Sequence, residues 1–137
     1  MEVNNATAPN SEQMAEFRVP DDGIAVHMVN LLKFKPKAEY YDGRQTDLTG
    51  KQAYDLYSAE VSKLIQKFGG SISFSGQVRR LALGEVAELW DAVAIAVYPS
   101  RAAMLKMMQS EEMKKIGIHR HAGLAGQLNL ETLVDDE

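Results

Sequence analysis

Residues 24–34 read IAVHMVNLLKF, and residues 88–98 read ELWDAVAIAVY. In both stretches apolar residues occur on each of the two alternating faces that a β-strand presents. Strands that are apolar on both faces are covered on both sides, whereas a half-exposed strand alternates between apolar and polar residues. We therefore predict two strands in a sheet that needs apolar cover on each face.

A helix is predicted between these two strands. Its apolar residues recur at the spacing of one helical face: Ala53, Tyr57, Val61, Leu64, Ile65 and Phe68. The glycine pair at 69–70 follows, and glycine readily adopts the left-handed conformation that ends a helix. Residues 35–50, before the helix, combine Pro, Gly, Asp and two adjacent tyrosines, which is typical of a loop. Residues 72–83 are predicted to form another strand, with a bulge at Gly76 and a turn after it at Gly84.

The last third of the chain predicts two short helices and a final strand. Ser100 can cap one helix, and Ser110, followed by two glutamates that favour the helix dipole, can cap the second. Gly117 and Gly123 flank the segment HRHA, after which residues 124–134 return to a strand pattern.

The predicted order is strand, helix, strand, strand, helix pair, strand. This is the order of a ferredoxin-like βαββαβ sheet, an α+β fold with its helices on one face. The sequence offers no further helix for the other face, so the simplest cover is the same sheet of a second copy. We expect a homodimer that forms a dimeric α+β barrel. Residues 21–137 are predicted to form its single domain, and residues 1–20 a flexible N-terminal arm.

Composition excludes several classes of function. The 137 residues are 45% hydrophobic and 25% charged, which is ordinary for one globular domain. A net charge of -4 argues against a nucleic-acid surface, which needs clustered Lys and Arg. No apolar stretch approaches the ~20 residues that cross a membrane, and residues 1–13 do not resemble a signal peptide, so we expect a cytoplasmic protein. Because the chain has no cysteine, it has no thiol nucleophile and no thiolate metal site.

Three segments share the pattern of one known family: VNLLKFKP at 29–36, KFGGSISFSGQV at 67–78 and WDAVAIAVYPSRAAMLKMMQS at 90–110. Together they resemble the domain-of-unknown-function 1330 family over roughly residues 24–134. The resemblance implies the dimeric barrel fold but no activity, because that family has none agreed. The segment HRHAGL at 119–124 and the long loop before the first helix depart from the family pattern. Barrels of this kind include cofactor-free monooxygenases, haem-degrading enzymes, stress-induced dimers and ligand-binding modules, so the fold does not select a function.

His119 and Arg120 are the candidate catalytic residues. Histidine titrates near neutrality and can move protons, while arginine can hold a carboxylate or an enolate. Adjacent residues in a strand or loop point apart, so both reach one site only if the backbone turns between them. The alternative is a helix end, where His and Arg favour the negative pole of the dipole. With His27 distant in sequence, the histidines do not predict a metal site.

Four residues are candidates for ligand binding. Asn30 interrupts the apolar run of the first strand, so it belongs either to a hydrogen-bond network or to a pocket wall. Tyr54, Trp90 and Tyr98 are candidates for the wall of a cavity that holds a small apolar or aromatic ligand, although aromatic residues at these spacings are more often core. No phosphate loop or dinucleotide fingerprint occurs, so no cofactor is predicted.

Two functions follow as hypotheses. The first is a homodimeric small-molecule-binding protein acting as a cofactor-independent enzyme, with His119 transferring a proton on a carbonyl or phenolic substrate and Arg120 holding the anion. The second is a non-catalytic ligand-binding or stress-associated dimer, in which the same residues cap a helix and shape the subunit contact.

Overall fold

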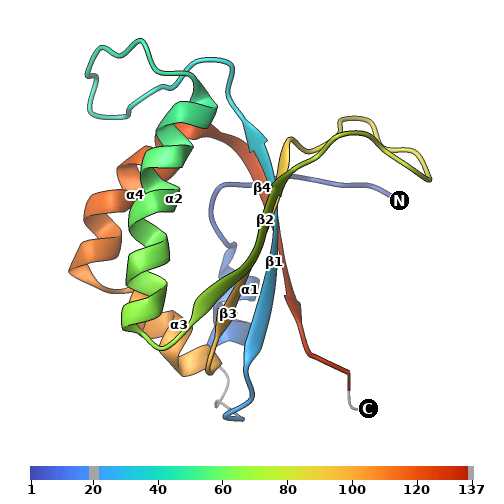
Figure 1. The fold of residues 1–137 in the computed structure, drawn as a ribbon, viewed down its shortest axis with the longest axis vertical. Helices are drawn as coiled ribbons and strands as arrows, with labels where there is room; N and C mark the ends of the chain where they lie inside the picture. Colours follow the sequence, from blue (N-terminus) through green and yellow to red (C-terminus); the bar gives the residue numbers. More distant parts are fainter. Residues whose placement is uncertain (19–21, 136–137) are drawn as a thin grey trace.

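The computed structural model describes residues 1–18 and 22–135. The elements, in chain order, are α1 (Ser11–Phe17), β1 (Val26–Phe34), α2 (Gly50–Lys67), β2 (Ser71–Gln77), β3 (Ala92–Tyr98), α3 (Arg101–Met108), α4 (Glu111–Gly123) and β4 (Leu124–Thr132). From β1 onward this is the predicted βαββαβ order, with two helices in the second crossover. Figure 1 shows the helices on one side of the sheet and the other side without a covering layer.

The sheet has the order β2-β3-β1-β4, and every neighbouring pair is antiparallel. The strand β1 lies inside the sheet because its backbone pairs with β3 on one side and with β4 on the other. This topology is the ferredoxin-like α+β fold, so the predicted fold class is confirmed.

The two faces of the sheet differ in cover. On the helix side Met28, Leu32 and Ala96 are at most 4% exposed. Met28 and Ala96 pack with the stripe of α2 that contains Val61 and Ile65 into the main core. On the other face the apolar side chains are only half-buried or exposed: Val29, Leu31, Phe74, Val93, Ile95, Val97, Leu128 and Leu130.

The helix boundaries follow local signals in the sequence. Thr49 and Gln52 form a capping box at the start of α2, and Gly69 ends the helix with φ +89°. The side chains of Ser100 and Ser110 cap α3 and α4 as predicted. Each cap satisfies an N–H group that has no partner within its helix.

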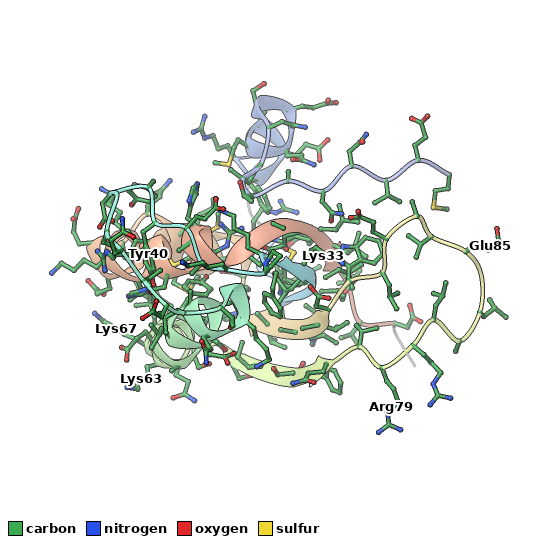
Figure 2. The ribbon with its side chains drawn as sticks, turned by 90° about the horizontal axis from the view of Figure 1, so that it is seen from above. Lys33, Tyr40, Lys63, Lys67, Arg79 and Glu85 are labelled. Atoms are coloured by element: carbon green, nitrogen blue, oxygen red, sulfur yellow. The ribbon has the colours of Figure 1, made fainter. Side chains whose placement is uncertain are left out.

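The strand boundaries near the 78–91 loop were predicted wrongly. The strand β2 ends at Gln77 rather than residue 83, and β3 begins at Ala92 rather than residue 88. The two strands separate there because the intervening loop is charged and turns at Gly84, where φ is +88°. Figure 2 shows Arg79 and Glu85 on this loop, away from the helices.

Two further expectations need correction. The register shift in β2 lies between Ile72 and Phe74, not at Gly76. The N-terminal arm, predicted without regular structure, contains α1, which starts with a capping box of Asn10 and Gln13. The helix α1 has no buried residue and is only 7 residues long, so it lacks the apolar stripe that identifies longer helices. The predicted domain boundary at residues 20–21 lies outside the described residues.

Candidate functional site

A cavity of about 740 Å³ lies between the sheet and the helices. This volume is within the range of small-molecule sites, which is roughly 300–1,000 Å³. The helix side of the sheet forms one wall, α2, α3 and α4 form the second, and the N-terminal arm forms the third. From the sheet the cavity is lined by Met28, Asn30, Ile72, Ser75, Ala94, Ala96, Tyr98, Gln127, Leu128, Asn129 and Glu131.

Asn30 starts a chain of hydrogen bonds along the sheet wall of the cavity. Its Nδ2 donates to the backbone oxygens of Met28 and Ala94, both at 3.1 Å, and its Oδ1 accepts from Gln127 Nε2 at 2.9 Å. Gln127 is only 8% exposed, so its amide needs these partners. The sequence left two roles open for Asn30, and the structure shows both: it belongs to a hydrogen-bond network and it lines the cavity.

Arg120 connects this network to α4 and to the N-terminal arm. Its Nη2 donates to Gln127 Oε1 at 2.7 Å, and its Nη1 donates to the backbone oxygen of Thr7 at 2.8 Å. Arg120 therefore holds together three segments that are far apart in the chain and places a positive charge at one end of the cavity.

Three tyrosines and several methionines line the rest of the cavity. Tyr54 and Tyr57 project from α2, and Tyr98 ends β3. Burial raises the pKa of all three phenols, that of Tyr57 to about 12, although the charge of Arg120 lowers the pKa of Tyr54 and Tyr57. At neutral pH these phenols are therefore neutral, and the Tyr57 hydroxyl donates to Met113 Sδ at 4.0 Å. The methionines are Met28, Met104, Met107, Met108 and Met113, whose flexible side chains adapt to irregular shapes.

The N-terminal arm reaches the cavity around the edge of β4. Ala6 pairs with Gln127 in an isolated bridge, and a Cβ atom on Gly126 would collide with Asn5. Thr7 and the following residues then line the cavity together with part of α1. Figure 1 shows the N-terminus on the open side of the sheet and α1 on the helix side.

Trp90 is not among the described residues that line the cavity. It precedes β3 on the 78–91 loop, and its Nε1 donates to Asn5 Oδ1 at 2.9 Å. In a strand over residues 88–98, Trp90 would share a face with Tyr98, but β3 begins only at Ala92, so Trp90 lies outside the strand.

His119 is also absent from the described lining of the cavity. Its Nδ1 lies 2.7 Å from Tyr40 Oη, and His121 packs edge-on against Tyr41, so both histidines contact the 35–49 loop. Because HRH lies within α4, its consecutive side chains are about 100° apart around the helix. The structure therefore does not bring His119 and Arg120 into one site.

The other end of the cavity contains an ion pair that the sequence did not predict. Arg101 Nη2, from α3, lies 3.1 Å from Glu131 Oε2, on β4. The polar residues Gln127, Asn129 and Glu131 alternate along β4 and share the helix side of the sheet. This period of two was the available signal in the sequence for a polar cavity wall.

Comparisons with known proteins give relatives of unknown function. No family model matches the chain, so the resemblance to the domain-of-unknown-function 1330 family stays a hypothesis. No curated protein matches either. A solved structure of a dimeric protein of unknown function with a ferredoxin-like fold, from Bacteroides fragilis, is 10% identical with a TM-score of 0.44 over 80% of this chain and 96% of its own. That protein is too distant to bear on assembly here. Within the described ranges no helix is long and apolar enough to cross a membrane.

Two solved structures are much more similar. A crystal structure of the RPA0582 protein of unknown function, from Rhodopseudomonas palustris, has a TM-score of 0.86 and 29% identity over 98% of this chain and 100% of its own. The structure of the methylated RPA0582 protein has a TM-score of 0.87 and 31% identity over 98% of both chains. Identity and coverage at this level show common descent as well as a common fold. The chain therefore belongs to the same family as the RPA0582 protein.

Proposed function

We propose that this chain is a homodimeric small-molecule-binding protein whose ligand occupies the cavity between the sheet and the helices. The observation that carries this proposal is the composition of the cavity wall. The wall of this 740 Å³ space combines apolar side chains with the convergent polar groups of Asn30, Gln127 and Arg120. Sites for small organic molecules combine an apolar lining with a few placed polar groups in this way.

Binding without catalysis agrees better with the placement of the titratable groups. Proton transfer by His119 needs that ring beside the ligand, whereas it contacts Tyr40 instead. The buried phenols have raised pKa values, so they are poor bases at neutral pH. The alternative is the cofactor-independent enzyme, with proton transfer on a carbonyl or phenolic substrate whose anion Arg120 holds. If the chain is such an enzyme, it is expected to turn over a compound that it binds, and Arg120→Gln is expected to abolish this turnover.

Filling the cavity tests the binding proposal. Ala94 lines the cavity, so Ala94→Phe is expected to occupy part of the space that a ligand needs. Ala59 is exposed on α2, and Ala59→Phe adds the same bulk outside the cavity. A panel of aromatic and aliphatic compounds is expected to raise the melting temperature of the wild type and of Ala59→Phe, but not of Ala94→Phe, because ligands stabilise the state that binds them. Equal shifts in all three proteins, or no shift with any compound, would contradict the proposal.

The proposed homodimer rests on the open face of the sheet. Val93, Ile95 and Val97 form its centre and are only half-buried, while Phe74 is 54% and Leu130 49% exposed. Large contiguous apolar surfaces of this kind are uncommon on soluble monomers. A second copy provides a matching apolar surface through a two-fold axis.

The charge on this face is compensated, which favours pairing between identical copies. Lys33 Nζ lies 3.8 Å from Asp91 Oδ1 and donates to the backbone oxygen of Leu89 at 2.9 Å. Two such faces can therefore meet without placing unpaired like charges opposite each other.

Light scattering tests the dimer. The wild type is expected to have about twice the mass of one chain, and Ile95→Asp is expected to be a monomer or to lose stability, because it buries a charge in the contact. Leu56→Asp is the control, since Leu56 is 47% exposed on α2, away from the open face. A folded wild-type monomer at micromolar concentration would rule out the dimer while leaving the cavity proposal intact.

A further inference from the structure

We infer that the cavity binds an elongated apolar molecule with a carboxylate at one end, and that Arg120 binds this carboxylate. The inference rests on the proposed binding function and adds the chemical class of the ligand.

The charge of Arg120 lacks a counter-charge. Among the residues that the structure describes, Arg120 forms no ion pair, and its two acceptors, Gln127 Oε1 and the backbone oxygen of Thr7, are neutral. A charge removed from water without a partner is unfavourable, so a cavity that holds one is suited to an anion.

Arg120 also has hydrogen-bond donors to spare. A guanidinium has five N–H donors, and two are used here, which leaves three. A carboxylate can accept two parallel hydrogen bonds from a guanidinium, a geometry that a neutral amide or alcohol does not match. The remaining donors of Arg120 are therefore suited to a carboxylate rather than to a neutral polar group.

The second arginine of the cavity differs in this respect. Arg101 is paired with Glu131 at 3.1 Å, so its charge is compensated within the chain. The remaining acid of the described lining, Glu16 on α1, is exposed to solvent and forms no ion pair with Arg120. The geometry thus places the carboxylate at the Arg120 end.

Beside the polar residues of β4, the cavity also has apolar surface that suits the body of a ligand. Gln127, which bonds Arg120, and Glu131, which bonds Arg101, are four residues apart on β4. At about 3.3 Å per strand residue this separation is roughly 13 Å. Met28, Met107 and Tyr57 contribute apolar surface to the same cavity. An aliphatic chain or an aromatic ring attached to a carboxylate fills such a space.

Calorimetry with a matched ligand pair tests this inference. Octanoate and octanamide share their apolar chain and differ in the charge of the head group. The wild type is expected to bind octanoate at least about tenfold more tightly, because a charge-assisted hydrogen bond is about twice as strong as a neutral one. The preference is expected to disappear in Arg120→Gln, to persist in weaker form in Arg120→Lys, and to be unchanged in the control Arg79→Gln, which is exposed on the 78–91 loop and outside the described cavity lining.

Each outcome separates the inference from the proposed function. Equal affinity for the two ligands in the wild type would overturn the carboxylate class but leave cavity binding in place, whereas binding of neither ligand nor any panel compound would overturn both. Circular dichroism checks that the variants fold. If Arg120→Gln does not fold, Arg120→Lys and Arg101→Gln still decide the question. A preference for octanoate that is lost in Arg101→Gln and kept in full in Arg120→Lys would show that Arg101 binds the carboxylate, and it would overturn the inference.

Discussion

Arg120 Nη2 and Gln127 Oε1 are joined by a 2.7 Å hydrogen bond that crosses the junction between α4 and β4. The strand begins at Leu124, directly after the helix, so no loop separates the two residues. This bond directs the last turn of α4 toward the sheet wall of the cavity. The polar end of the cavity is therefore built by the junction itself.

Removing the amide of Gln127 is expected to destabilise the fold. Gln127→Leu keeps much of the side-chain volume but leaves Asn30 Oδ1 without its donor and Arg120 Nη2 without its acceptor. Unsatisfied buried polar groups cost about 1–3 kcal/mol each, so we expect the free energy of unfolding to fall by roughly 3 kcal/mol. Urea denaturation measures this change, with Gln66→Leu on the exposed side of α2 as the control. Equal stability of the two variants would show that the network contributes nothing.

Alkaline pH is expected to destabilise the protein through its buried tyrosines. Burial raises the pKa of Tyr57 from 10.0 to about 12, and it raises the pKa values of Tyr54 and Tyr98 in the same direction. The stabilisation is fully present below pH 10 and is lost as pH rises toward the folded-state pKa, because the unfolded chain ionises first. Two pKa units correspond to roughly 3 kcal/mol for Tyr57. In Tyr57→Phe the free energy of unfolding is expected to fall less as the pH rises above 10 than it does in the wild type. An equal fall in both proteins would contradict the raised pKa of Tyr57.

Two glycines of α4 are expected to respond to alanine in opposite ways. A Cβ atom on Gly117 meets no atom within 4 Å, so Gly117→Ala is expected to raise stability by about 0.5–1 kcal/mol through helix propensity. A Cβ atom on Gly123 would collide with the backbone oxygen of Gly50 and approach Tyr54 N to 2.9 Å. Gly123→Ala is therefore expected to lower stability by roughly 3 kcal/mol. Thermal melts of the two variants compare the effects, and two changes of the same sign would contradict this packing.

The pair of His119 and Tyr40 is expected to stabilise the 35–49 loop without affecting the ligand. His119→Phe keeps a ring beside Tyr40 but removes the 2.7 Å hydrogen bond, and Tyr40→Phe removes the same bond from the other side. Each change is expected to cost about 1 kcal/mol, and the double variant little more than either single one. Hydrogen exchange in the loop and ligand calorimetry are the measurements. A large loss of ligand affinity or turnover in His119→Phe would restore His119 to the functional site.

Much of the fold could be predicted from the sequence because its signals act over short distances. The stripe from Ala53 to Ile65 and the glycine pair at 69–70 define α2 within single helical turns. The caps of α3 and α4 likewise involve residues only three positions apart. The misplaced start of β3 has the same origin, since ELW at 88–90 matches a strand by local pattern but has no strand partner in the sheet.

The candidate site was predictable only in part. Asn30, Tyr54 and Tyr98 were candidates for a cavity wall beside the alternatives of a hydrogen-bond network and the core, and they line the described cavity. The sequence could not show that His119 faces a loop and Arg120 the cavity, because that division depends on α4 continuing past Gly117 and on the rotation of the helix against the sheet.

By itself, the sequence determined the order of helices and strands from β1 onward, the caps of α3 and α4 and the apolar faces, because neighbouring residues interact whatever the rest of the chain does. Only the tertiary structure decided the cavity. Its polar end depends on Asn30 and Gln127, 97 residues apart, and on Arg120 and Thr7, 113 residues apart. Such contacts form only when the sheet is assembled and the N-terminal arm has crossed its edge, and no local pattern encodes that geometry.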